Sequence, residues 1–171
     1  MRWIGIDLGT QAVGFAVVEG TQQNYVLTHW DVLRVARAPL PHRMNAIYTW
    51  LSQKVEKWTP FQAVGIEEPF VGRNVRSALL LGTVKGLVWA LLLQRGFEAP
   101  VTLSPSEVKR AITGRAHASK EQVSGMLSHH LHLPPSPPAD PDAVDAAAIA
   151  LAVAYAQNSP MILRLTKRAD K

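Results

Sequence analysis

The first third of the chain has the short apolar runs that are typical of β-strands. Three runs, 3–6, 14–18 and 25–32, are rich in β-branched and aromatic residues, and a glycine-containing turn separates the first two. Such runs bounded by turn residues predict strands, and the first two are expected to pair as a hairpin. Alternation in 25–32 is imperfect, but this run extends the same meander. We expect three leading antiparallel strands.

Helical and strand patterns alternate after residue 39. Apolar residues recur at steps of three and four through 40–58, which predicts an amphipathic helix ended by Thr59 and Pro60. The run 63–67 predicts a short buried strand that finishes in two acids. A long apolar helix is expected over 74–95, and a fifth strand over 101–103.

Helix-start motifs organise the C-terminal half. Ser104 before a proline, and Ser119 with Gln122 three residues later, are typical N-caps. They predict helices over 104–112 and 119–130. Residues 133–141 contain five prolines and predict an extended connector. The alanine-rich segment 142–157 has few charges and predicts a mostly buried helix.

This order of elements predicts an α/β fold of the RNase H-like class. The sheet is mixed and five-stranded, its three leading strands are antiparallel, and helices cover both faces. The 171 residues fit one domain, which we place at 1–158. The basic tail, 159–171, is expected to fray or to be disordered.

Composition limits the kinds of metal site and binding partner that the chain can have. The chain has no cysteine, which excludes disulfides and thiolate zinc sites, so a bound metal would be a hard cation held by oxygen or histidine. The net charge of +5 has the sign expected for a nucleic-acid partner. No uninterrupted apolar run reaches the roughly 18 residues that span a bilayer, so we expect no membrane association. Asp7 interrupts the N-terminal run before a signal-peptide core forms, and a cytoplasmic location is expected.

Four acidic residues stand at the boundaries of apolar stretches. Asp7 ends the first strand and Glu67 ends the fourth, while Asp142 and Asp145 open the last helix. A strand-end aspartate also serves as a turn cap, so Asp7 alone decides nothing. Adjacent strand residues point to opposite faces, so only one of Glu67 and Glu68 shares a face with Asp7. We choose Glu67, because Pro69 already turns the chain after Glu68.

The spacing of the last pair is more informative. Residues three apart share a helix face, so Asp142 and Asp145 point the same way. Asp140 lies roughly 140° from Asp145 around the axis, and we assign it to the N-cap ahead of Pro141. Asp142 also suits a helix start through the macrodipole. Asp145 lies among apolar residues, where an unpartnered acid is unfavourable.

Four neighbouring carboxylates need a cation if all are to ionise. Hard divalent ions prefer oxygen ligands, and a pair about 4 Å apart clamps a phosphodiester, activating water on one side and stabilising the leaving oxygen on the other. The acids therefore predict phosphodiester hydrolysis with two Mg²⁺ ions per site, for which Mn²⁺ can substitute.

Five segments, in order, resemble the motifs of the RuvC family of Holliday-junction resolvases. They are GIDLGTQAVGFAVV, VGIEEPF, NVRSALLLGTVKG, SEVKRAITGRAHASKEQV and DAVDAAAIALAVAY, and they cover about residues 4–155. The resemblance implies an RNase H-like fold, a homodimer and paired nicks in opposing strands of a four-way DNA junction. It also implies that Asp7, Glu67, Asp142 and Asp145 are the catalytic metal ligands.

The resemblance further implies a DNA-binding set. Phe70 matches an aromatic residue that stacks on bases at the opened junction centre, although the same ring could pack the loop. Lys109 and Lys120 match basic DNA-binding residues, and solvated helix faces are the alternative. For Arg110 and Lys85 the solvated face is the better interpretation. The full expected set is Phe70, Arg73, Asn74, Arg76, Lys109, Arg115, His117 and Lys120.

Gly82 and Gly86 lie on the helix that matches the family's dimer element, where they would allow close packing, although they equally suit packing on the sheet.

One position departs from the family pattern, since Leu8 stands where proline is usual. GIDLGT also resembles the phosphate loop of sugar-kinase and actin-like ATPases and the start of YqgF-type nucleases. A YqgF-type nuclease and a junction-binding protein without cleavage activity therefore stay as alternatives. A branch-migration complex is a further candidate partner that the sequence does not decide.

Overall fold

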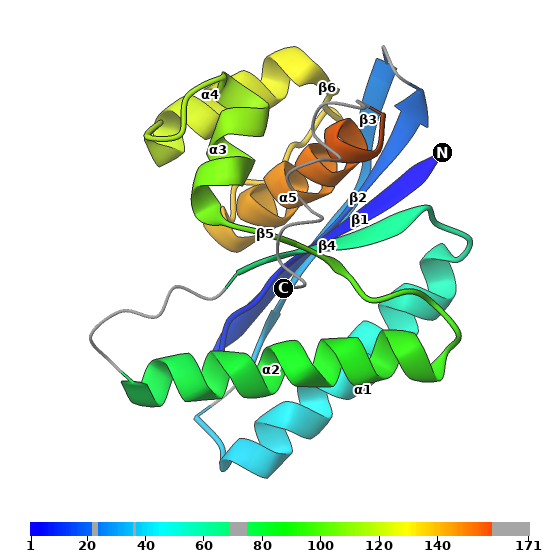
Figure 1. Cartoon of the computed structure of the whole chain (residues 1–171), viewed down its shortest axis with the longest axis vertical. Helices are drawn as coiled ribbons and strands as arrows, with labels where there is room; N and C mark the ends of the chain where they lie inside the picture. The colour runs from blue at the N-terminus through cyan, green and yellow to red at the C-terminus, as the bar shows by residue number, and fades with distance from the viewer. Residues whose placement is uncertain (22–23, 36, 69–74, 159–171) are drawn as a thin grey trace, which may run out of the picture.

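The structure is a computed structural model that describes residues 1–21, 24–35, 37–68 and 75–158 (Figure 1). Strands and helices alternate after three leading strands. In chain order the described elements are β1 Arg2–Asp7, β2 Ala12–Thr21, β3 Asn24–Arg34, α1 Leu40–Trp58, β4 Ala63–Glu67, α2 Val75–Gln94, β5 Val101–Leu103, α3 Pro105–Thr113, α4 Lys120–His130, β6 Leu131–His132 and α5 Pro141–Asn158.

One mixed sheet runs through the molecule in the order β5-β4-β1-β2-β3-β6. The three leading strands pair antiparallel, as predicted, whereas β4 and β5 run parallel to β1. The expectation of five strands was wrong, because β6 adds a sixth strand parallel to β3. This strand has only two residues, Leu131 and His132, which are too few to show the alternation of apolar and polar positions that predicts a strand. It begins directly after the last residue of α4.

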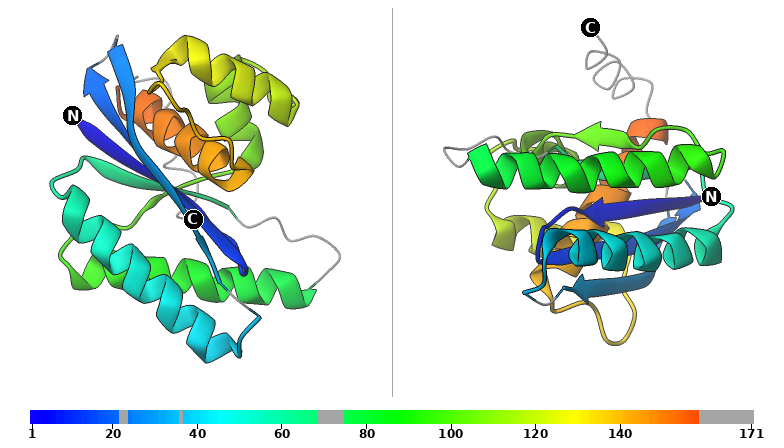
Figure 2. Two further views of the ribbon diagram at one scale, coloured as in Figure 1. Left: turned by 180° about the vertical axis from the view of Figure 1, so that it is seen from behind. Right: turned by 90° about the horizontal axis from the view of Figure 1, so that it is seen from below.

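Helices cover both faces of the sheet (Figure 2). α1 and α2 pack on one face around Ile4, Ile6 and Ile66, and α3, α4 and α5 cover the other around Trp3. Strand alternation divides β1 accordingly: Trp3, Gly5 and Asp7 share the α5 face, and the two isoleucines point to α1 and α2. Both faces are therefore buried, which explains the unbroken apolar runs of the central strands.

A β-bulge explains the imperfect alternation of the third strand. The register between β2 and β3 shifts between Val17 and Val18, which pair with His29 and Leu27, so Thr28 is left as an extra residue. The strand is also longer than the predicted 25–32, because it continues to Arg34 beside Ala12.

The predicted helix starts are confirmed in α3 and α4. The hydroxyls of Ser104 and Ser119 accept hydrogen bonds from the backbone amides of Glu107 and Gln122. In return, the side chains of Glu107 and Gln122 accept hydrogen bonds from the backbone N–H of the two cap serines. At the start of α5, Asp140 Oδ1 accepts from the Asp142 amide at 3.1 Å, as expected of an N-cap.

α2 presents an apolar face to solvent. Val75, Leu79 and Leu93 are 65%, 69% and 54% exposed, and a Cβ added at Gly82 or Gly86 would meet no atom within 4 Å. The alternative that these glycines pack on the sheet is therefore wrong. By length and composition alone α2 could cross a membrane, contrary to the expectation that no segment would qualify, although one such helix is weak evidence of a membrane protein.

Candidate active site

Two of the four predicted acids are brought together by the pairing of β1 with β4. These strands run parallel, with Gly5 opposite Gly65 and Ile6 opposite Ile66, so Asp7 and Glu67 end neighbouring strands on the same face. Glu68 points to the other side of the sheet, where both of its carboxylate oxygens accept from Lys85 Nζ of α2, at 2.9 and 2.7 Å. The choice of Glu67 over Glu68 agrees with this geometry.

The other two acids come from the first turns of α5, which lies directly against the sheet. A Cβ added at Gly14 would fall 2.0 Å from the carbonyl oxygen of Asp142, and one at Gly5 would fall 2.0 Å from that of Ala146. Only glycine leaves room for a backbone contact this close. The contact places the N-terminal end of α5 beside the end of β1, within electrostatic reach of Asp7.

Electrostatic effects relate the other three carboxylates to Asp7. Burial, together with the charges of Asp145, Glu67 and Asp142, raises the pKa of Asp7 from 3.8 to about 7. The pKa of Glu67 is also raised, first by burial and then by Asp145. Near neutral pH, Asp7 therefore exchanges a proton readily and favours a nearby cation.

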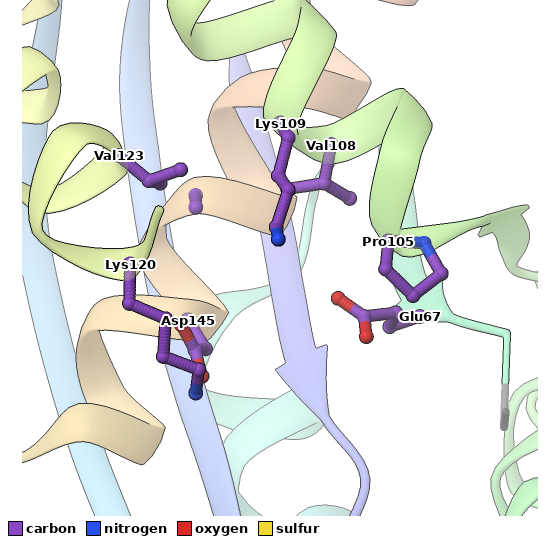
Figure 3. A pocket seen from close by; sticks show the side chains of 8 residues that line it. Glu67, Pro105, Val108, Lys109, Lys120, Val123 and Asp145 are labelled. Atoms are coloured by element: carbon purple, nitrogen blue, oxygen red, sulfur yellow. The ribbon is translucent and has the colours of Figure 1, made fainter. Parts of the chain in front are cut away.

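A small cavity of about 180 Å³ opens beside these acids (Figure 3). Lys109 of α3 and Lys120 of α4 reach toward it, with Glu67 on one side and Asp145 on the other. Lys120 Nζ donates to Asp145 Oδ2 at 2.6 Å, and this hydrogen bond raises the pKa of Lys120. The cavity thus brings two acids, from β4 and α5, together with two lysines, from α3 and α4. Its remaining lining residues are Pro105, Val108, Val123 and Ala148.

The donor set fits hard divalent cations, because it consists of carboxylate oxygens. Among the described residues, no three acidic or histidine side chains form a ready-made chelating group. Lys120 contacts one oxygen of Asp145, so binding of a cation there would require Asp145 to exchange the ammonium group for the metal. A bound cation would stabilise the ionised form of Asp7 most, because Asp7 has the most strongly raised pKa of the group.

The chain matches the family model "Crossover junction endodeoxyribonuclease RuvC" over residues 3–154. It belongs to the RuvC family. The RuvC protein of Thermomicrobium roseum is 37% identical over 159 residues, covering 93% of this chain and 94% of that protein. That of Roseiflexus sp. is 39% identical over 166 residues, covering 96% and 95%.

Solved RuvC structures agree with the fold. Thermus thermophilus RuvC in complex with Holliday junction substrate has a TM-score of 0.82 and 30% identity, covering 91% of this chain and 93% of that one. The yeast mitochondrial Holliday junction resolvase Ydc2, at 14% identity and a TM-score of 0.64, shares the fold. The fold is RNase H-like, as predicted.

Of the residues expected to bind DNA, two line the acidic cavity and three others are exposed elsewhere on the described part of the chain. Lys109 and Lys120 line the cavity, and Arg115 and His117 are exposed on the turn between α3 and α4. Arg76 is exposed in the first turn of α2. Three expected residues, Phe70, Arg73 and Asn74, lie outside the described residues. Arg110 is exposed, as the interpretation of a solvated helix face requires. Lys85 departs from that interpretation, because its side chain is only 21% exposed and pairs with Glu68.

Sequence reasoning missed Arg34 at the end of β3. Its Nη2 pairs with Asp140 Oδ2 at 2.5 Å, and its Nη1 lies 3.7 Å from Asp142 Oδ2. No local pattern marks this arginine, because the contact depends on how the end of β3 meets the start of α5. His130, by contrast, has a structural contact, since its Nε2 lies 2.9 Å from the carbonyl oxygen of Ile112.

Proposed function

We propose that this chain is a structure-selective endonuclease that resolves four-way (Holliday) DNA junctions by paired hydrolysis of opposing strands. Membership of the RuvC family supports the proposal, as does the likeness to a RuvC protein solved with Holliday junction substrate. The observation that carries it is the convergence of four carboxylates from β1, β4 and α5, with two lysines lining the cavity beside them. Acids facing cations at one cavity suit a phosphodiester, since the lysines attract the phosphate.

Asp7, Glu67, Asp142 and Asp145 are the proposed ligands of two Mg²⁺ ions, for which Mn²⁺ substitutes. When bound, the ions supply an activated water and stabilise charge on the leaving oxygen. Lys109 and Lys120 hold the non-bridging phosphate oxygens, because both line the cavity beside the acids, Lys109 from α3 and Lys120 from α4 (Figure 3). Phosphate binding also gives Lys120 an anionic partner to replace Asp145.

A homodimer formed through α2 would supply the second active site that paired cleavage needs. The exposed stripe Val75, Leu79, Gly82, Gly86, Trp89 and Leu93 advances in steps of four and three. That spacing is typical of a helix seam that packs against another helix. The two open glycines in its middle let a partner helix approach closely. We therefore propose that a second copy covers this face.

The dimer is tested by analytical ultracentrifugation of Leu79→Glu at several concentrations, with Thr49→Glu, on the exposed side of α1, as the matched control. Leu79→Glu should be monomeric, because two acids would be buried in the seam. It should nick single strands without the paired cut. A wild-type monomer, or a wild-type protein that partitions into lipid vesicles, would contradict a seam covered by a second copy.

The activity is tested with a labelled four-way junction and Mg²⁺ or Mn²⁺, followed by mapping of the nicks. Symmetric nicks in opposing strands are expected, and Asp7→Asn and Asp145→Asn should abolish them while junction binding persists. Unaltered cleavage by both variants would refute the assignment. Binding without cleavage by the wild type would favour a junction-binding protein, and faster cleavage of flaps or single-stranded RNA would favour a YqgF-type nuclease. A branch-migration complex and a cytoplasmic location stay predictions from the sequence.

A further inference from the structure

Arg34 connects the end of β3 to the first turn of α5. Its guanidinium contacts two acids there, Asp140 Oδ2 at 2.5 Å and Asp142 Oδ2 at 3.7 Å. Asp140 Oδ1 in turn accepts from the Asp142 amide at 3.1 Å. The three residues therefore form one network in which Asp142 is held at both its backbone and its side chain.

The network bears on the active site, because Asp142 raises the pKa of Asp7 and so lies within electrostatic reach of it. Arg34 engages Oδ2, which leaves the other oxygen of this carboxylate for the site. The Asp142 carbonyl is fixed as well, by its contact with β2 at Gly14. With the backbone held by Asp140 and β2, the remaining freedom of Asp142 is rotation of its side chain, and Arg34 restricts that rotation.

We propose that Arg34 is a positioning residue for Asp142, which orients this carboxylate for a divalent cation. The inference rests on the proposed function only for the identity of the site. Arg34 is 63% exposed, so its ion pairs contribute little to folding. Partners that orient a metal ligand, in contrast, commonly change metal affinity by about 10- to 100-fold when they are removed.

The direction in which cation affinity changes when Arg34 is removed distinguishes a positioning role from the effect of its positive charge alone. If Arg34 acted only as a nearby positive charge, its removal would tighten cation binding, because like charges repel. If it orients Asp142, its removal weakens binding although a repulsive charge has gone. Removal of Lys120 should have the opposite effect and tighten cation binding. Lys120 donates a hydrogen bond to Oδ2 of the proposed ligand Asp145 and so competes with a cation for that oxygen.

The test is calorimetric titration of metal-free, DNA-free protein with Mn²⁺ and with Mg²⁺. Arg34→Gln should bind about tenfold more weakly than wild type. Arg34→Lys keeps the charge but lacks the planar fork of the guanidinium, so its affinity should fall between those of wild type and Arg34→Gln. Arg37→Gln is the charge-matched control, because Arg37 is exposed and makes no ion pair among the residues that the structure describes, and it should bind like wild type.

Cleavage supplies the second measurement. Arg34→Gln should need about tenfold more Mn²⁺ for half-maximal cleavage and approach the wild-type rate at saturating metal. Unchanged or tighter metal binding by Arg34→Gln would overturn the proposal. A drop in junction affinity in EDTA would also overturn it, since Arg34 would then contact DNA. If wild type bound metal but cut no junction, the proposed function would fail while the affinity difference would still stand.

Discussion

Asp7→Asn should stabilise the metal-free protein at high pH, because the fold holds this acid where ionisation is unfavourable. Burial and three neighbouring acids raise the pKa of Asp7 from 3.8 to about 7. The folded state therefore binds a proton at this group more tightly than the unfolded chain does. The stabilisation from Asp7 is fully present below pH 3.8 and is lost as the pH rises to about 7.

The magnitude follows from the two pKa values. One pKa unit corresponds to about 1.4 kcal/mol, so a difference of about three makes ionised Asp7 unfavourable by up to about 4 kcal/mol above pH 7. Asparagine has nearly the same shape and does not titrate. The variant should therefore match wild type near pH 4 and exceed its free energy of unfolding by up to about 4 kcal/mol at pH 8, which corresponds to a rise in Tm of about 10 °C.

The assay is urea unfolding at intervals from pH 4 to pH 8.5 in EDTA. Asp31→Asn is the matched control on β3. Burial is the largest single influence on the pKa of Asp31 and raises it, but the hydrogen bonds from Lys54 and from the Val32 amide, together with the nearby positive charge, hold the pKa below its usual value. This variant should be less stable than wild type at pH 7, and the difference should shrink as the pH falls toward 3.

The reasoning is refuted if Asp7→Asn differs from wild type by the same amount at pH 4.5 and pH 8. It is also refuted if the variant is less stable than wild type at pH 8 without metal. Saturating Mg²⁺ should reverse the order of stability at pH 8, because the wild-type site then gains binding free energy and the variant does not.

The remaining predictions concern the packing of α5 and the lysine of the cavity. Gly14→Ala should lower the free energy of unfolding by about 1–3 kcal/mol and impair cleavage, because its Cβ would fall 2.0 Å from the Asp142 carbonyl oxygen and displace the first turn of α5. Gly125→Ala, with no atom within 4 Å, should instead stabilise α4 by up to about 1 kcal/mol, and thermal unfolding distinguishes the two. Lys120→Gln should bind Mn²⁺ a few times more tightly in calorimetry, because it no longer competes for Asp145, yet it should cut junctions more slowly. Weaker Mn²⁺ binding by this variant would contradict that account.

The sequence predicted the elements that carry the site because their patterns are local. Capping serines, one-turn spacing and strand-end acids each depend on a few neighbouring residues, and they located Asp142 and Asp145 on one helix face. The two-residue strand β6 could not be predicted, since it has too few residues for a period. The contact between Arg34 and Asp142 depends on tertiary register, and the exposure of Leu79 depends on which face of the mostly apolar helix α2 meets the sheet.

The glycines of the sheet connect the stability of this protein to its chemistry. Gly5, Gly14 and Gly65 all face α5, and a Cβ on any of them would meet that helix at 2.0–2.3 Å. A larger residue would lift α5 from the sheet and carry Asp145 away from Asp7. The close approach that assembles the carboxylates is also what buries Asp7, and burial is the largest cause of its raised pKa. The instability of the ionised metal-free site and the cation affinity that we propose for it therefore have one structural origin. A substitution that relieved this instability by lifting α5 from the sheet should also abolish cation binding.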